Sequence, residues 1–174
     1  MTYLINALVL IVTVVAMEGA VALTHRYVMH GWGWGWHRSH HEVHDDLLEK
    51  NDLYAIVFGG FTFGLIVLGW QQGFSPIYFV GIGKTLYGFL YFFVHDGLVH
   101  QRWPFRVVPK HPYMKRLVQA HRLHHATHGR DGAVSFGFLW AKPVRELKAE
   151  LKARHGRVDL DETRDLREQR ASAP

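Results

Sequence analysis

Residues 53–94 read LYAIVFGGFTFGLIVLGW, QQGFS and PIYFVGIGKTLYGFLYFFV, which are two apolar runs separated by five residues. Each run is long enough as a helix to cross a hydrocarbon core of about 30 Å. The only charged side chain in the two runs is Lys84. The short connection at 71–75 predicts a tight turn, so we expect a pair of membrane-spanning helices that begins and ends on one side of the membrane.

A third apolar segment, residues 2–24, precedes this pair and contains one acidic or basic side chain, Glu18. A cleaved signal peptide is the alternative interpretation, but no basic residue precedes the apolar run, and cleavage would detach it from His25 and His30. A fourth stretch, 133–140, is too short to cross and is more typical of a re-entrant or interfacial segment. We therefore expect an all-α integral membrane helical bundle with three or four membrane-embedded helices.

Length and composition narrow the possibilities further. The 174 residues suit a single domain, which we place at 1–155, followed by a charged and flexible tail at 156–174. Because the chain has no cysteine, cysteine-ligated zinc, iron–sulfur clusters and disulfides are excluded. The formal net charge of +5 suits a membrane partner, and we expect no nucleic acid.

The basic residues predict the orientation in the membrane. Residues 97–130 contain no acid, whereas the 71–75 turn has no Lys or Arg. By the positive-inside rule, segments 25–52 and 95–128 both lie on the cytoplasmic side. No transit peptide is visible, which favours a bacterial inner membrane. Segment 97–130 carries seven basic residues, which are Arg102, Arg106, Lys110, Lys115, Arg116, Arg122 and Arg130.

Thirteen of the fourteen histidines lie in these two segments, where two spacings each occur twice. The pairs with four intervening residues are His25/His30 and His95/His100, and the HxxHH motifs are His37/His40/His41 and His121/His124/His125. Another histidine follows each HxxHH motif, at His44 and His128. The repetition predicts a cap with two metals, for which the ten motif histidines are the candidate ligands and His44 and His128 are possible additional ones. His111 and His155 lie outside the motifs and are expected to be ordinary.

Helix geometry explains the HxxHH spacing, because residues i, i+3, i+4 and i+7 share one face. Histidines five apart are rotated by roughly 140° on an α-helix, so they must serve different metals or sit where the helix distorts. Two acids could support the ligands. Glu18 could pair with Lys84 or hold a ligand imidazole through its other nitrogen, and Asp96 is a similar candidate beside His95.

The ligand type does not decide the metal, since imidazole suits zinc, copper, iron or nickel. The clusters lie at the ends of apolar helices, where a hydrophobic substrate could reach them, and this placement favours redox chemistry at two irons. The chain lacks the Glu-x-x-His motif of soluble di-iron carboxylate proteins, so such a centre would be ligated by histidine.

The segments HRYVMHG (25–31), WHRSHHE (36–42), LLEKND (47–52), FFVHDGLVH (92–100), QAHRLHHA (119–126) and VSFGFLW (134–140) support a closer comparison. Together they resemble the bacterial β-carotene hydroxylases, within the histidine-rich di-iron membrane fatty-acid hydroxylase superfamily. The resemblance covers about residues 15–150. It implies O2-dependent hydroxylation at carbon 3 of each β-ionone ring, from β-carotene through β-cryptoxanthin to zeaxanthin. It also implies two non-haem irons on the ten motif histidines, a carotenoid substrate in the bilayer and a ferredoxin-type electron donor.

Two alternatives remain open at this point. One is a fatty-acid or sterol hydroxylase or desaturase of the same superfamily. The other is a histidine-rich metal transporter or metal-binding membrane protein, for which we would expect histidines within the apolar runs. Those runs contain none. The basic segment could dock an acidic electron donor, or it could reflect membrane topology alone.

Overall fold

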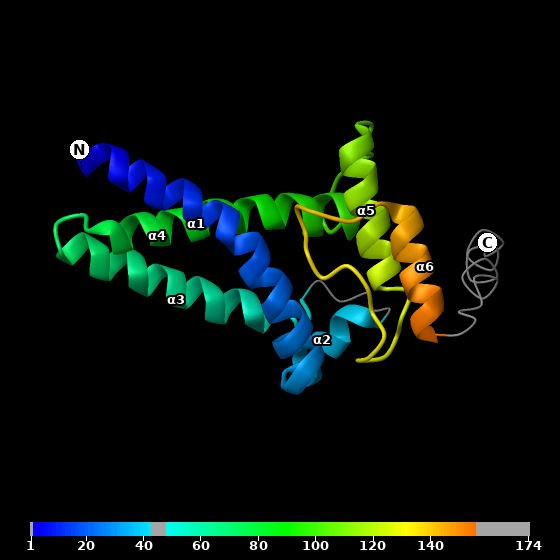
Figure 1. Ribbon diagram of the computed structural model, residues 1–174. Helices are drawn as coiled ribbons and strands as arrows, with labels where there is room; N and C mark the ends of the chain where they lie inside the picture. Colours follow the sequence, from blue (N-terminus) through cyan, green and yellow to red (C-terminus); the bar gives the residue numbers. More distant parts are fainter. Residues whose placement is uncertain (1, 43–47, 156–174) are drawn as a thin grey trace.

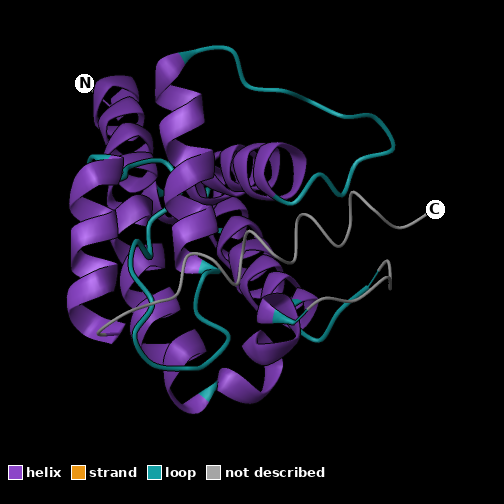
Figure 2. Cartoon of the chain, turned by 90° about the vertical axis from the view of Figure 1, so that its right-hand side faces the viewer, coloured by secondary structure: helices purple, strands orange, loops and turns teal. Residues whose placement is uncertain are grey.

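The fold is known from a computed structural model, which describes residues 2–42 and 48–155. The expected tail at 156–174 lies outside the described residues. The helices are α1 (Thr2–Thr24), η1 (His25–Trp32), α2 (Trp34–His41), α3 (Asp52–Gln71), α4 (Pro76–Phe92), η2 (Phe93–Val99), α5 (Pro112–His124) and α6 (Val144–His155). Helices and loops account for all the described residues, with no strand among them (Figure 2). The expectation of an all-α fold is confirmed.

Three helices are long and apolar enough to cross a membrane, at Tyr3–Trp32, Asp52–Gln71 and Pro76–Val99. Figure 1 shows α1 and α3 each packed along α4, with the N-terminus and the 71–75 turn at one end and α2, α5 and α6 at the other. The two histidine-rich segments therefore lie at the same end of the bundle, as the even number of intervening spans predicted. The fourth apolar stretch, 133–140, forms no helix.

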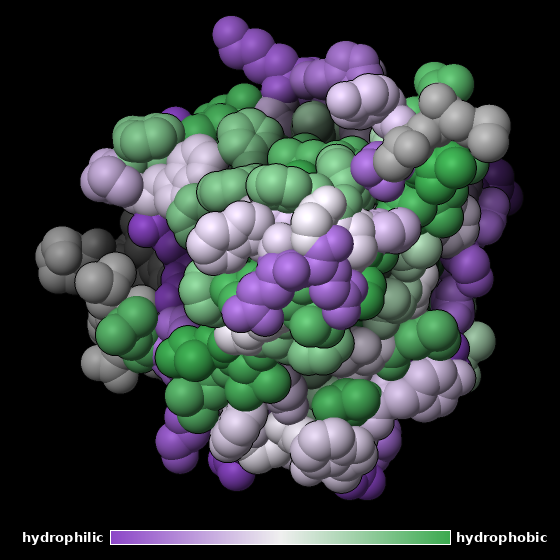
Figure 3. Space-filling model, turned by 90° about the vertical axis from the view of Figure 1, so that its left-hand side faces the viewer, coloured by the Kyte–Doolittle hydropathy of each residue, from purple (hydrophilic) through white to green (hydrophobic). Residues whose placement is uncertain are grey.

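Small residues set the close packing of the three long helices. A Cβ added at Gly69 would lie 2.2 Å from the backbone N of Tyr78, and one at Gly81 would lie 2.6 Å from Ile66. Because glycine has no side chain, the helix backbones approach closely, as is usual for helices packed within a membrane. Large apolar side chains such as those of Val15 (70% exposed) and Phe89 (67% exposed) point outward. Figure 3 views the end of the molecule at the 71–75 turn, where hydrophobic side chains (green) cover much of the face.

The opposite end has a small core of its own. Leu117 and Val118 of α5 pack with Leu147 and Leu151 of α6, and the cluster extends to Val134. The guanidinium of Arg154 donates a hydrogen bond to the carbonyl oxygen of Ala133 at 2.6 Å. These contacts fix segment 133–141, which runs without regular structure beside the histidines.

Both histidine-bearing spans continue beyond their apolar runs. α1 passes into the π-helical η1, and α4 passes into the π-helical η2. The backbone leaves helical geometry within η1 at Gly31 (φ −105°, ψ −124°). The His25/His30 and His95/His100 pairs therefore sit on the distorted ends of two spanning helices.

Candidate metal centre

The structure brings the ten motif histidines together from four separate segments. Their ligand atoms form groups, and the atoms within each group lie within 4.8 Å of one another. One group comprises His25, His30, His37 and His124, a second comprises His40, His95, His100 and His121, and a third comprises His41, His124 and His125. Nitrogen ligands at this density can hold two metals.

The third group lies between the other two, because His41 is next to the first group and His125 is next to the second. The ring of His41 lies 4.9 Å from that of His30, whereas Nε2 of His125 lies 2.9 Å from Nε2 of His121. The rings of His41 and His125 are stacked 4.4 Å apart. We therefore define cluster A as His25, His30, His37, His41 and His124, and cluster B as His40, His95, His100, His121 and His125.

The π-helices decide the pairing of histidines five residues apart. In a π-helix the backbone hydrogen bonds run from i to i+5, so residues five apart lie one turn apart on the same face. The N–H of His100 accordingly donates to the carbonyl of His95 at 2.9 Å. Of the two alternatives for this spacing, the distorted helix is confirmed, since each pair belongs to a single cluster.

The HxxHH motifs, by contrast, each contribute to both clusters. On α2, His37 and His41 belong to cluster A and His40 to cluster B. The motif at the end of α5 places His124 in cluster A and His121 in cluster B. The histidines of one motif spread across a helical face, and so they can contribute to both clusters.

Seven of the imidazoles are oriented by hydrogen bonds from Nδ1 to an acceptor outside the clusters, at 2.7–3.0 Å. These bonds are His25 to Phe136 O, His30 to Arg130 O, His37 to Asn51 Oδ1, His40 to Glu49 Oε1, His41 to Thr127 O, His95 to Asp96 Oδ1 and His124 to Val134 O. Because these acceptors carry no proton, each Nδ1 holds the hydrogen and each Nε2 presents a lone pair.

The inward-facing nitrogens fit a metal cation. Nε2 of His25 lies 3.0 Å from Nε2 of His37, and the same atoms of His30 and His124 are 3.1 Å apart. Two lone pairs at that separation repel unless a cation lies between them. The Nε2 atom of His41 is buried and has no hydrogen-bond partner among the described residues. The donor geometry thus matches metal coordination by neutral imidazole.

Burial also keeps the ligands in the form that binds metal. It lowers the pKa of His37 to about 3 and the pKa of His41 to about 4. Burial lowers the pKa of His121 and of His124 as well, with neighbouring imidazoles adding to the effect. Neutral histidine is the form that coordinates metals, so these side chains are ready ligands at neutral pH.

The remaining histidines have other positions. His44 lies outside the described residues. His128 is exposed and belongs to none of the ligand groups in the described part of the chain. The side chain of His111 accepts a hydrogen bond from the N–H of Tyr113 at 3.3 Å and caps α5, consistent with the ordinary role expected for it.

Asp96 lies where it was expected, with its carboxylate 2.7 Å from Nδ1 of His95. Two further side chains with the same function, Glu49 and Asn51, escaped the sequence reasoning. Both lie in the LLEKND segment, which carried part of the family resemblance although no role was assigned to it. Backbone carbonyl groups within residues 127–136 also accept hydrogen bonds from the histidines. The sequence does not mark them, because every residue has a backbone carbonyl.

The contacts of Glu18 differ from both expectations. Its carboxylate accepts hydrogen bonds from the backbone N–H groups of Phe138, Leu139 and Trp140 at 2.9–3.0 Å, and from the hydroxyl of Tyr87 at 2.6 Å. Lys84 instead has its Nζ 3.7 Å from Met17 Sδ. Glu18 anchors segment 133–141 because that segment packs over α1 and presents three N–H groups. Its influence on the histidines passes through the backbone of this segment.

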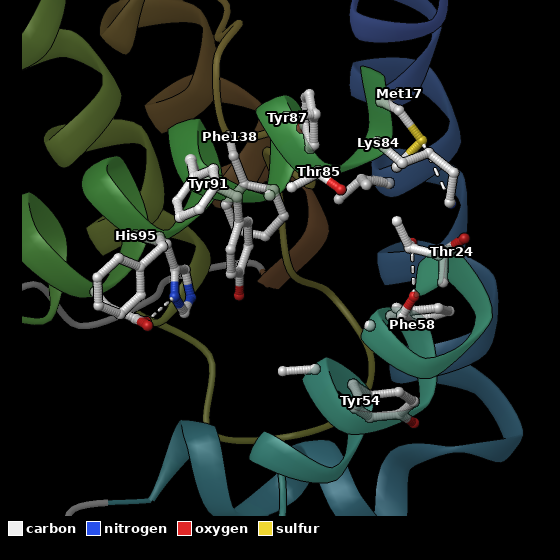
Figure 4. A pocket seen from close by; sticks show the side chains of 18 of the residues that line it. Met17, Thr24, Tyr54, Phe58, Lys84, Thr85, Tyr87, Tyr91, His95 and Phe138 are labelled. Atoms are coloured by element: carbon white, nitrogen blue, oxygen red, sulfur yellow. Dashed lines mark hydrogen bonds and ion pairs between the residues drawn. The ribbon is translucent and has the colours of Figure 1, made fainter. Parts of the chain in front are cut away.

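A cavity of about 640 Å³ lies between α1, α3 and α4 and reaches cluster B. Figure 4 shows His95 on one side of it and Met17 and Lys84 on the other, with Tyr54 and Phe58 projecting from α3. Its volume is in the range of small-molecule sites, and most of its lining is apolar. A hydrocarbon can therefore approach the histidines from within the bundle.

Comparisons with known proteins agree with this site. The fatty acid hydroxylase family model matches residues 10–142. A β-carotene hydroxylase of Pantoea ananas is 56% identical over 156 residues, which is 90% of this chain and 89% of that protein. A β-carotene hydroxylase of a Paracoccus strain is 53% identical, covering 84% of this chain and 91% of its own length.

A plant relative extends the comparison. The chloroplastic β-carotene 3-hydroxylase 1 of Arabidopsis thaliana is 37% identical over 137 residues, covering 76% of this chain and 44% of that protein. No solved structure matches the chain significantly. The family match includes all four histidine motifs and segment 133–141. The chain belongs to the fatty acid hydroxylase family.

Proposed function

We propose that this protein is a β-carotene 3-hydroxylase, which adds a hydroxyl group to each β-ionone ring and converts β-carotene through β-cryptoxanthin to zeaxanthin. The observation that carries the proposal is an apolar cavity ending at a double cluster of ten histidines. The bacterial relatives, named β-carotene hydroxylases, support the substrate, and the plant relative, named a 3-hydroxylase, supports the position on the ring.

Two iron ions would be held by clusters A and B. Bound iron would supply the O2-dependent oxidation of an unactivated C–H bond, for which protein side chains have no equivalent. The chain itself orients the ligands, since the bonds from Nδ1 fix which nitrogen of seven imidazoles faces inward. The apolar walls formed by α1, α3 and α4 receive the hydrocarbon and exclude water from it.

The proposed electron donor is a ferredoxin-type protein that docks on the basic face of the cap. Five cations of segment 97–130 are exposed: Arg106, Lys110, Lys115, Arg122 and Arg130. Arg102 does not belong to this surface, because it forms an ion pair with Asp52 at 2.9 Å and only 24% of its side chain is exposed. By the distribution of basic residues, the cap lies on the cytoplasmic side of a bacterial inner membrane.

Expression of the chain in bacteria that accumulate β-carotene tests the function. Chromatography and mass spectrometry of the extracted pigments should show products that have gained one and then two oxygen atoms. His124→Ala, which removes a buried cluster A ligand, should leave β-carotene unchanged. Unchanged β-carotene with an iron-loaded wild-type protein in the membrane would refute the carotenoid assignment. The next substrates to test would then be fatty acids and sterols.

A further inference from the structure

The two histidine clusters differ in the charge of the groups that orient them. In cluster A every Nδ1 donates to an uncharged acceptor. Four of these acceptors are backbone carbonyls, and the fifth is the side-chain amide of Asn51, 2.7 Å from Nδ1 of His37. The nearby carboxylate of Asp131 is 87% exposed and so is largely screened by solvent.

Cluster B, in contrast, is held by two carboxylates in the described part of the chain. Glu49 accepts from Nδ1 of His40 at 2.8 Å, and Asp96 accepts from Nδ1 of His95 at 2.7 Å. The side chain of Glu49 is 3% exposed, and that of Asp96 is 16% exposed. In such surroundings solvent screens a charge less than it does at the surface, so both carboxylates act on the imidazoles beside them.

Arg102 connects these acids into one network. Its guanidinium lies 3.5 Å from Glu49, 4.0 Å from Asp96 and 2.9 Å from Asp52. Among the residues that the structure describes, these three carboxylates face one guanidinium, which is a formal charge of −2 beside cluster B. Arg102 therefore holds the acids in position without neutralising them.

A carboxylate that accepts a hydrogen bond from a ligand imidazole makes that imidazole a stronger donor toward a metal. An anionic surrounding also favours the more highly charged state of the bound ion. Both effects act on cluster B, which is also the cluster that meets the cavity, because His95, Asp96 and Arg102 line it.

We propose that the two metal positions are inequivalent: cluster B binds its metal more tightly than cluster A does, through Glu49 and Asp96 as positioning residues. This inference rests on the metal-binding role in the proposed function. It assigns the substrate-facing position to the cluster with the anionic support.

Titration of the metal-free, detergent-solubilised protein with Co²⁺ tests the inference without any assay of activity. Binding is followed by visible absorption against a competing chelator, and we expect two steps of different affinity. Glu49→Gln and Asp96→Asn keep an acceptor for each imidazole and remove one charge. Each should weaken the tighter step by about 10- to 100-fold, as is typical for groups that support metal ligands, and leave the weaker step unchanged.

Asn51→Asp is the matched reciprocal variant, because it adds a carboxylate to cluster A at His37. It should tighten the weaker step alone and bring the two affinities together. For every variant, circular dichroism and the binding step that the variant is expected to leave unchanged control for folding.

Two steps of equal affinity in the wild type would overturn the inequivalence. So would Glu49→Gln and Asp96→Asn variants that alter both steps equally or neither of them. Failure of the wild type to bind two Co²⁺ ions would instead refute the double metal site of the proposed function. The two failures are therefore distinguishable.

Discussion

Glu18→Ala tests whether a single carboxylate in the first span holds the loop that orients cluster A. The carboxylate accepts four hydrogen bonds, three from consecutive backbone N–H groups of segment 133–141 and one from Tyr87. That segment in turn supplies the carbonyls of Val134 and Phe136, which accept from His124 and His25 at 3.0 Å each. Removing Glu18 should therefore release two cluster A ligands without touching a histidine.

The magnitude follows from the number and kind of the bonds. Hydrogen bonds to a charged group contribute about 1.5–3 kcal/mol each, which sets the upper limit for four of them. Glu18 is only half-buried and Trp140 is 63% exposed, so water replaces part of what is lost. We expect Glu18→Ala to lower the free energy of unfolding by about 3–5 kcal/mol.

Glu18→Gln is the matched control. Its amide oxygen can keep the three N–H donors, all of which reach Oε1, and its NH2 group can donate to the oxygen of Tyr87. The loss should then be only about 1–2 kcal/mol, the difference between charged and neutral acceptors.

Hydrogen exchange at the amides of 138–140 and the iron content per chain are the measurements. Glu18→Ala should lose protection at these amides and one of the two metals, whereas Glu18→Gln should retain both. Full protection and full metal content in Glu18→Ala would refute the anchoring role of Glu18.

The other predictions concern single positions. His124→Ala should lose metal from cluster A and abolish hydroxylation, whereas His128→Ala should retain both in metal analysis and pigment analysis, because His128 is exposed and outside the ligand groups. Gly69→Ala should lower the free energy of unfolding in detergent by about 1–3 kcal/mol, because its Cβ would lie 2.2 Å from the backbone of Tyr78. Gly64→Ala is the control, because nothing lies within 4 Å of the added Cβ, and an equal effect there would contradict this reasoning. Lys84→Met should lower the KM for β-carotene several-fold, because it removes a charge from an apolar cavity, and a higher KM would show that the ammonium group assists binding.

The spanning helices and the shared location of the histidine segments could be predicted from the sequence because hydrophobicity and chain connectivity determine them. A run of apolar residues is a local property, and an even number of crossings returns the chain to the same side. The fourth stretch, 133–140, was recognised as too short to cross. The sequence could not indicate that its backbone would accept hydrogen bonds from His25 and His124.

The role of Glu18 shows the same limit. Its place inside an apolar span identified it as unusual, yet its partners are backbone N–H groups some 120 residues away in the chain. From side-chain pairing rules, the expected partners are Lys84 or a ligand imidazole. Backbone donors carry no sequence signal, so only the folded chain reveals them.

The sequence by itself determined the chemistry of the candidate metal ligands, because ten histidines at two repeated spacings supply nitrogen donors. Only the tertiary structure decided how those donors are divided. The π-helical ends of two spans place histidines five apart in one cluster, while each HxxHH motif divides between two. The charge difference between the clusters also arises only on folding, because Glu49, Asp96 and Arg102 meet from separate segments. Local spacing determines which side chains can bind a metal, whereas helix geometry and helix packing determine which of them lie at the same metal position.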